Sequence, residues 1–131
     1  MSNTTEAGIE FDDSCEFNDK PCKSFPAKLT QLLYRRYKSG LNGFIILPCE
    51  LIDNNGDELK RCVLKYAEYW NLEEAFVNWL EKENCFANTL VDRIVTGYPT
   101  DETKEIYPDD KFLTTAEIFH LWVIEENFED E

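Results

Sequence analysis

The sequence lacks most of the motifs that assign a function to an α/β protein. It contains no GxGxxG, GxxxxGK[ST] or GxSxG motif, and so neither a standard phosphate-binding loop nor a nucleophile elbow. Its only histidine is His120, and its five cysteines form no CxxC pair, which argues against a zinc site. We therefore assign no catalytic residue and no metal ligand within the chain.

Positive charge is also scarce. The 131 residues include 13 Lys and Arg against 27 Asp and Glu, a net charge of -14. This excess argues against nucleic acid or an anionic membrane surface as a partner. No apolar run approaches the about 20 residues of a transmembrane helix, and the first residues lack the pattern of a secretory signal peptide. With an odd cysteine count, these features predict a cytoplasmic protein with reduced thiols.

The chain has enough apolar side chains for one folded domain, since 43% of its residues are hydrophobic and 14% aromatic. An unbroken apolar run at residues 44–47 predicts a strand buried on both faces, as in a parallel sheet covered by helices. A polar loop containing Glu50 follows, and a helical pattern begins after Gly56. Strand, loop and helix form half of a βαβ unit.

Ligands of open α/β sheets bind beyond the carboxyl ends of the strands. Glu50 and the loop up to Gly56 are therefore the first place to look for function. The simpler interpretation is that residues 54–56 (NNG) form only a turn and a helix start.

Helical periodicity predicts three helices. The first begins at Ser24, with Pro26 in its first turn, and ends at residues 39–40. The second is capped by Asn55 or Asp57. The third begins at Asn71, whose spacing from Glu74 resembles a capping box. The second helix has an apolar face formed by Leu59, Cys62, Val63, Tyr66 and Trp70.

Two later stretches have the composition of strands. Residues 89–95 alternate well enough for a strand or an extended segment, and residues 118–124 are rich in β-formers. Asp92 and Arg93 interrupt the first of these apolar runs, and burying a charge is costly unless it is paired. We therefore expect specific partners for both, with a structural ion pair and a role in a site equally open. His120 is expected to be structural.

Five stretches, in order along nearly the whole chain, show a family resemblance. They are residues 2–9 (SNTTEAGI), 24–30 (SFPAKLT), 48–53 (PCELID) with Asn55 and Gly56, 88–99 (NTLVDRIVTGYP) and 122–128 (WVIEENF). Together they resemble the long-chain mannitol dehydrogenase family, and most closely its tagaturonate reductase (altronate oxidoreductase) branch.

The resemblance implies an α/β fold, a partial Rossmann-type NAD-binding domain in which strands alternate with helices. It implies an NAD-dependent oxidoreductase that interconverts tagaturonate and altronate by hydride transfer without a metal. Residues 1–131 match as a single piece the later part of the N-terminal NAD-binding domain. The Gly-rich fingerprint and the C-terminal catalytic domain have no counterpart here. We therefore expect a fragment that is inactive alone and binds NAD weakly or not at all.

The resemblance also implies site positions. The cofactor-binding positions are Asn3, Thr4, Thr5, Glu6 and Asp92, and the positions that bind the sugar-acid substrate are Glu50, Asn88 and Arg93. Polyol-oxidising members have Cys-Asp-Asn where this chain has Cys49, Glu50 and Leu51. Leu51 cannot donate the hydrogen bond that this asparagine gives the developing oxyanion. The departure favours the tagaturonate branch over a mannitol assignment.

A non-catalytic acidic α/β module that acts by protein–protein contact is the alternative, and an acidic mimic of phosphate is a more distant one. The module would fold stably and have no affinity for a nucleotide. In either case a sheet without its first strands exposes apolar edges. We therefore expect self-association through these edges.

Overall fold

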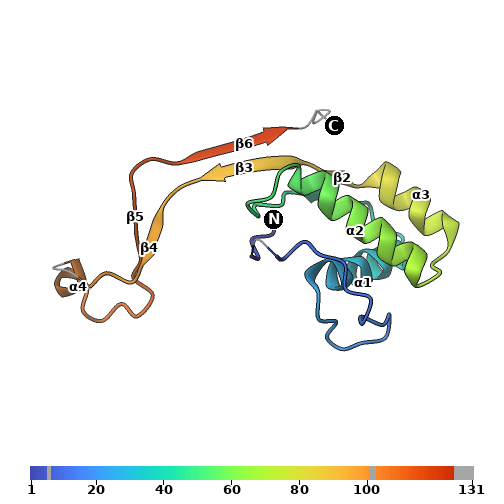
Figure 1. Ribbon diagram of the computed structural model, residues 1–131, viewed down its shortest axis with the longest axis horizontal. Helices are drawn as coiled ribbons and strands as arrows, with labels where there is room; N and C mark the ends of the chain where they lie inside the picture. Colours follow the sequence, from blue (N-terminus) through green and yellow to red (C-terminus); the bar gives the residue numbers. More distant parts are fainter. Residues whose placement is uncertain (6, 101–102, 126–131) are drawn as a thin grey trace.

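The computed structural model describes residues 1–5, 7–100 and 103–125, which form a helical body and an extended arm (Figure 1). The body holds α1 (Phe25–Lys38), β1 (Ile45–Ile46), α2 (Asn55–Tyr69), α3 (Glu74–Glu83) and β2 (Cys85–Phe86). The arm, residues 88–125, holds β3 (Asn88–Asp92), β4 (Val95–Gly97), α4 (Thr103–Ile106), β5 (Thr115–Ala116) and β6 (Leu121–Glu125). Figure 1 shows the arm leading away from the body, with α4 at its far end.

Helix α1 begins and ends as its sequence predicts. The Ser24 hydroxyl accepts a hydrogen bond from the Ala27 N–H at 3.3 Å, and a proline occupies the first turn. The last turn contains basic residues, whose positive charge interacts favourably with the negative end of the helix dipole. Ser39 is the C-cap, and Gly40 follows with a φ of 66°, which glycine adopts at little cost.

The core of the body lies between its three helices. Four members of the predicted apolar face of α2 are confirmed, because Leu59, Cys62, Val63 and Tyr66 are all fully buried. The fifth, Trp70, is the C-cap that follows the helix and is half-buried. Leu33 of α1 and Phe76 of α3 belong to the same core as most of that face. The Tyr66 hydroxyl lies 2.8 Å from the Ser24 hydroxyl and accepts a hydrogen bond from the Asp12 N–H, which fixes the N-terminal segment to the helices.

The predicted caps of α2 and α3 are wrong. Asn54, not Asn55 or Asp57, is the N-cap of α2, in a left-handed conformation with φ 51° and no side-chain capping bond. Helix α3 begins after Glu73, so Asn71 and Glu74 form no capping box, and Asn71 adopts a turn with φ 50°. Tertiary contacts explain both results. The Asn55 side chain bonds to other segments, and the Glu73 carboxylate accepts hydrogen bonds from Tyr34 and Lys38.

Strands β1 and β2 pair in parallel, with Ile45 opposite Cys85, and the helices α2 and α3 connect them. A parallel bridge from Ser2 to Pro48 adds a third extended segment on the other side of β1. The predicted βαβ arrangement is thus present. The prediction of a strand buried on both faces is wrong, because Ile46 is buried in the core while Ile45 is 60% exposed. The helices of the body cover one face only.

The arm is built from two antiparallel pairs, β3 with β6 and β4 with β5. The strand predicted over residues 118–124 is β6, which begins later, at Leu121. The expectation of a specific partner is confirmed for Arg93, whose Nε donates to the Glu117 carbonyl. The expectation that Asp92 and Arg93 are buried is wrong, because both are exposed, and neither forms an ion pair within the described residues. Their strand leaves the body and runs in a two-stranded ribbon. Within the described part of the chain, no helix is long and apolar enough to span a membrane.

Candidate functional site

Four segments meet at the carboxyl end of β1, next to the N-terminus of the chain (Figure 1). They are the segment from Ser2 to Thr4, the loop of Cys49 and Glu50, the first turn of α2, and the start of β3. The Ser2 N–H donates to the Leu47 carbonyl at 3.1 Å, and the Cys49 N–H donates to the Ser2 carbonyl at 2.9 Å. This is the edge of the sheet at which an open α/β fold binds its ligands.

Glu50 joins the N-terminal segment to this edge. Its side chain is only 4% exposed. One carboxylate oxygen accepts hydrogen bonds from the Thr4 N–H and the Thr4 hydroxyl, both at 2.9 Å, and the other accepts from the Ser2 hydroxyl at 3.0 Å. Burial opposes ionisation of this carboxyl, yet these hydrogen bonds outweigh it and hold the pKa of Glu50 below its usual value. Glu50 is therefore an anion at neutral pH, fixed in place by the residues it holds.

Asn55 connects the other segments, a role that differs from the helix cap predicted for it. Its side chain is 1% exposed. The amide nitrogen donates to the carbonyls of Pro48, Glu50 and Thr89 at 3.0–3.1 Å, and the amide oxygen accepts from the Thr89 N–H at 2.8 Å. The sequence alone cannot predict this bridging role, because an asparagine at the start of a helix is also a common N-cap.

The start of β3 lies against the first turn of α2. The Asn88 amide oxygen accepts from the Asp57 N–H, and its nitrogen donates to the Asp57 carboxylate, both at 3.1 Å. The Thr89 hydroxyl donates to the Pro48 carbonyl. A Cβ on Gly56 would lie 2.5 Å from the Ala87 carbonyl oxygen, so only glycine permits this close approach.

The structure brings some of the predicted site residues together and separates others. Thr4, Glu50 and Asn88 belong to the network just described, and Asn3 and Thr5 are exposed beside it. Glu6 lies outside the described residues. Asp92 and Arg93 lie farther along the arm, where the Arg93 Nε donates to the Glu117 carbonyl at 3.2 Å. The roles of all these residues in cofactor and substrate binding stay predictions.

The side chains of this network hold other groups in position. Burial raises the pKa of the nearby Cys49 thiol, so Cys49 is not an activated nucleophile. The described residues contain no group of three or more His, Cys, Asp or Glu side chains that could hold a metal ion. Leu51, beside Glu50, presents an exposed apolar side chain. The arrangement can orient backbone and hydroxyl groups toward a ligand.

Comparison with known proteins matches nearly the whole chain to one family. The profile of the family described as "Mannitol dehydrogenase Rossmann domain" matches residues 2–131. Altronate oxidoreductase of Yersinia enterocolitica is 52% identical over 133 aligned residues, and that of Shigella flexneri is 54% identical over 135. In both cases the match covers 95% of this chain and 28% of the relative. The chain thus spans about 28% of the length of the curated relatives it matches.

Two solved structures share the fold. D-sorbitol dehydrogenase in substrate-free form has a TM-score of 0.77 at 24% identity, over 97% of this chain and 29% of that one. Mannitol 2-dehydrogenase of Pseudomonas fluorescens, in a ternary complex with NAD and D-mannitol, has a TM-score of 0.73 at 22% identity, over 94% of this chain and 28% of that one. The predicted family resemblance and the predicted partial Rossmann-type α/β fold are both confirmed.

Proposed function

Because this chain belongs to the mannitol dehydrogenase family through its Rossmann domain, we propose that it is the later part of the N-terminal NAD-binding domain of an oxidoreductase. That enzyme interconverts tagaturonate and altronate by hydride transfer between the sugar acid and NAD. The observation that supports this substrate class is the identity of 52–54% with altronate oxidoreductases over nearly the whole chain. A cytoplasmic location accords with the absence of disulfides among the described residues.

The network at the carboxyl end of β1 supports a role in cofactor binding. Glu50 holds the Ser2–Thr4 segment by three hydrogen bonds, and the neighbouring Asn3 and Thr5 side chains are exposed. Asn3, Thr4 and Thr5 would thus contact the cofactor from a fixed backbone. With its oxygens already bonded, Glu50 acts on the substrate through this segment rather than by direct contact.

Arg93 suits the carboxylate of a sugar acid. A guanidinium pairs with a carboxylate through two parallel hydrogen bonds, and the Arg93 side chain is exposed. Asn88, the first residue of the arm, is hydrogen-bonded to α2, whereas Asp92 and Arg93 lie farther along the arm. These residues would therefore form one site only when the arm is held in place. The chain contains no GxGxxG motif, so the pyrophosphate would be bound by another part of a family-length protein.

A chimera tests this proposal. The matched segment of the Shigella flexneri altronate oxidoreductase is replaced by residues 1–131 of this chain, and NADH oxidation with tagaturonate is measured. We expect the folded chimera to turn over and the chain alone to show none. A chimera with a cooperative melting transition but no NADH oxidation would contradict the proposal and favour the acidic binding module.

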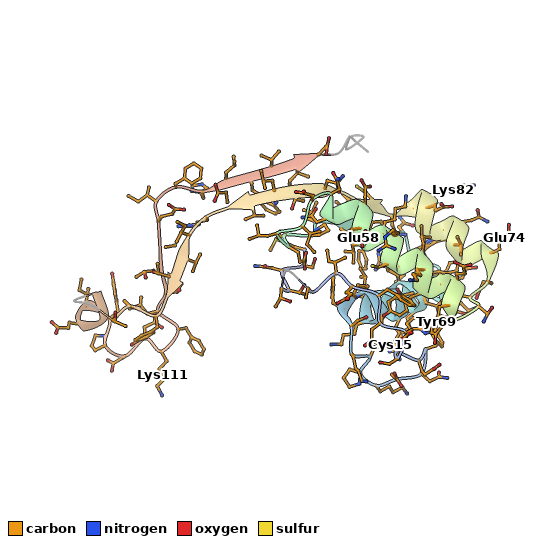
Figure 2. All side chains as sticks on the ribbon, viewed as in Figure 1. Cys15, Glu58, Tyr69, Glu74, Lys82 and Lys111 are labelled. Carbon is orange, nitrogen blue, oxygen red and sulfur yellow. The ribbon has the colours of Figure 1, made fainter. Side chains whose placement is uncertain are left out.

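A substitution in the chimera tests the substrate assignment. Arg93→Ala is expected to raise the KM for tagaturonate at least about tenfold through loss of a charge-assisted pair. The matched control is Lys111→Ala, which removes an equal charge at the far end of the arm (Figure 2). Equal KM values for the two variants would remove Arg93 from the substrate site.

A further inference from the structure

Two direct backbone hydrogen bonds of a parallel ladder join the chain at β2 to the chain at β1. The Cys85 N–H donates to the Phe44 carbonyl at 3.0 Å, and the Ala87 N–H donates to the Ile46 carbonyl at 3.1 Å. Such ladder bonds recur at even spacing along a parallel pair. The next ladder bond should therefore run from the N–H two residues after Ala87 to the carbonyl two residues after Ile46.

That next ladder bond is interrupted by a side chain. The Thr89 N–H donates to the Asn55 amide oxygen at 2.8 Å, and the Asn55 amide nitrogen donates to the Pro48 carbonyl at 3.1 Å. The Asn55 carboxamide thus lies between the two backbone groups that a direct ladder bond would join. Pro48 also lacks the N–H that would continue the ladder, so the backbone by itself cannot extend the regular pairing.

The same carboxamide contacts the loop that holds the N-terminal segment. Its nitrogen donates to the Glu50 carbonyl at 3.0 Å, and the Glu50 carboxylate accepts hydrogen bonds from Ser2 and Thr4. On its other side the carboxamide bonds to both the N–H and the carbonyl of Thr89, the residue after Asn88. Asn55 therefore joins the segment proposed to bind the cofactor to the strand proposed to bind the substrate.

We propose that Asn55 is a positioning residue for hydride transfer, whose inserted carboxamide sets the spacing between the cofactor-binding segment and the substrate-binding strand. The inference rests on the proposed function. Two hydrogen bonds and an amide group replace one ladder bond, so β3 diverges from β1 at the ligand edge of the sheet. The Asn55 side chain is 1% exposed, and its hydrogen bonds fix its orientation. A shift of about 1 Å between reacting groups can cost about a hundredfold in rate.

Amide exchange in the chain alone, followed by NMR, tests the inserted carboxamide without any cofactor. We expect Asn55→Ala to speed exchange of the Thr89 amide at least about tenfold relative to the Ala87 amide, whose own ladder bond to Ile46 is kept. The ratio of the two rates removes the effect of a general loss of stability. An unchanged ratio would overturn the proposal, because Thr89 would then be held without Asn55.

Kinetics of the chimera test the positioning itself. We expect Asn55→Ala to lower kcat at least about tenfold, with a smaller change in the KM for NADH or tagaturonate. The primary isotope effect with NADH deuterated at the transferred hydrogen should rise, because hydride transfer then limits the rate. Partial unfolding cannot mimic this result, since it removes active molecules and leaves the KM values and the isotope effect unchanged.

The matched control is Tyr66→Phe, which removes a hydrogen bond from the Asp12 N–H in the body. It is expected to lower stability and to leave kcat and the isotope effect unchanged. An Asn55→Ala chimera with the kcat and isotope effect of this control would overturn the positioning role.

Asn55→Asp separates the two ends of the carboxamide and serves also where the alanine variant does not fold. A carboxylate still accepts from the Thr89 N–H, but it cannot donate to the Pro48 and Glu50 carbonyls. At pH 7 we expect slower Thr89 exchange than in Asn55→Ala, together with a lowered kcat. An unchanged kcat in Asn55→Asp would show that these donors do not position the site.

The outcomes distinguish this inference from the proposed function. If the unsubstituted chimera oxidises no NADH, the oxidoreductase assignment fails and the role of Asn55 in hydride transfer fails with it. If the unsubstituted chimera is active and Asn55→Ala behaves as the control, the oxidoreductase assignment stands and the positioning role alone is refuted.

Discussion

Asn55 determines whether the carboxyl end of β1 holds its shape, and Asn55→Ala tests this directly. The substitution removes an amide whose oxygen accepts from the Thr89 N–H and whose nitrogen donates to three carbonyls. The Glu50 carbonyl keeps a second donor, the Ile52 N–H at 2.8 Å, and the Pro48 carbonyl keeps the Thr89 hydroxyl. The Thr89 N–H has no other partner in the described contacts of this network.

The expected cost follows from this one group. An unsatisfied buried N–H costs about 1–3 kcal/mol, and the lost bonds to the carbonyls add to it. We therefore expect Asn55→Ala to lower the free energy of unfolding by about 2–4 kcal/mol, a large part of the about 5–15 kcal/mol of a small domain. Urea denaturation, monitored by the fluorescence of Trp70 and Trp79, measures this change in the free energy of unfolding. Asn78→Ala, on the exposed side of α3, is the control.

Asn55→Asp, of nearly equal volume, sharpens the test. Its carboxylate would face the carbonyl oxygens of Pro48, Glu50 and Thr89, so its pKa in the folded state lies above the about 3.9 of an unfolded aspartate. A group whose folded pKa is raised loses stability as the pH rises through that range. The cost of Asn55→Asp should therefore grow from pH 4 to pH 7. The reasoning would be refuted if Asn55→Ala lowered the free energy of unfolding by less than about 0.5 kcal/mol, or if the cost of Asn55→Asp did not change with pH.

Three further changes follow from the same contacts. The pKa of Glu50 is lowered in the folded protein. Its contribution to stability is therefore fully present above about pH 4.3, the pKa of an unfolded glutamate, and is lost as the pH falls below it. Glu50→Gln should flatten the dependence of the free energy of unfolding on pH below about pH 4.5. Tyr66→Phe removes the acceptor of the Asp12 N–H and should cost about 1–3 kcal/mol in urea denaturation, and a loss under 0.5 kcal/mol would contradict this. Gly56→Ala should lower the melting midpoint although alanine favours a helix, because its Cβ would press on the Ala87 carbonyl; a rise would show that the backbone yields.

The fold of the body could be predicted where local signals agree. Ser24, Pro26 and the apolar spacing that follows point to one helix, and the spacing from Leu59 to Tyr66 points to another. The caps of α2 and α3 could not be predicted, because Asn55 and Glu73 bond to other segments rather than to their own helix ends. Local sequence rules cannot anticipate a side chain that a distant segment recruits.

The candidate site was predictable in its location but not in its construction. A polar loop after a buried strand indicates the ligand edge of an α/β sheet, and Glu50 lies there. The burial of Glu50 under Ser2 and Thr4 could not be read from a sequence separation of nearly fifty residues. The error at Asp92 and Arg93 has another cause. Flanking apolar residues predict burial only when the strand stays in a core, and this strand leaves it.

The residues implied in the site divide into two physical classes, and the division explains why the chain should not act alone. Thr4, Glu50 and the first residue of the arm, Asn88, are held by hydrogen bonds to residues of the body, so their positions are set before any ligand arrives. Asp92 and Arg93 lie on a ribbon with two open faces, so their positions depend on whatever encloses the arm. Catalytic geometry requires both classes to be fixed at once. The chain by itself fixes only the first class, which is the physical reason why we expect no activity from it alone.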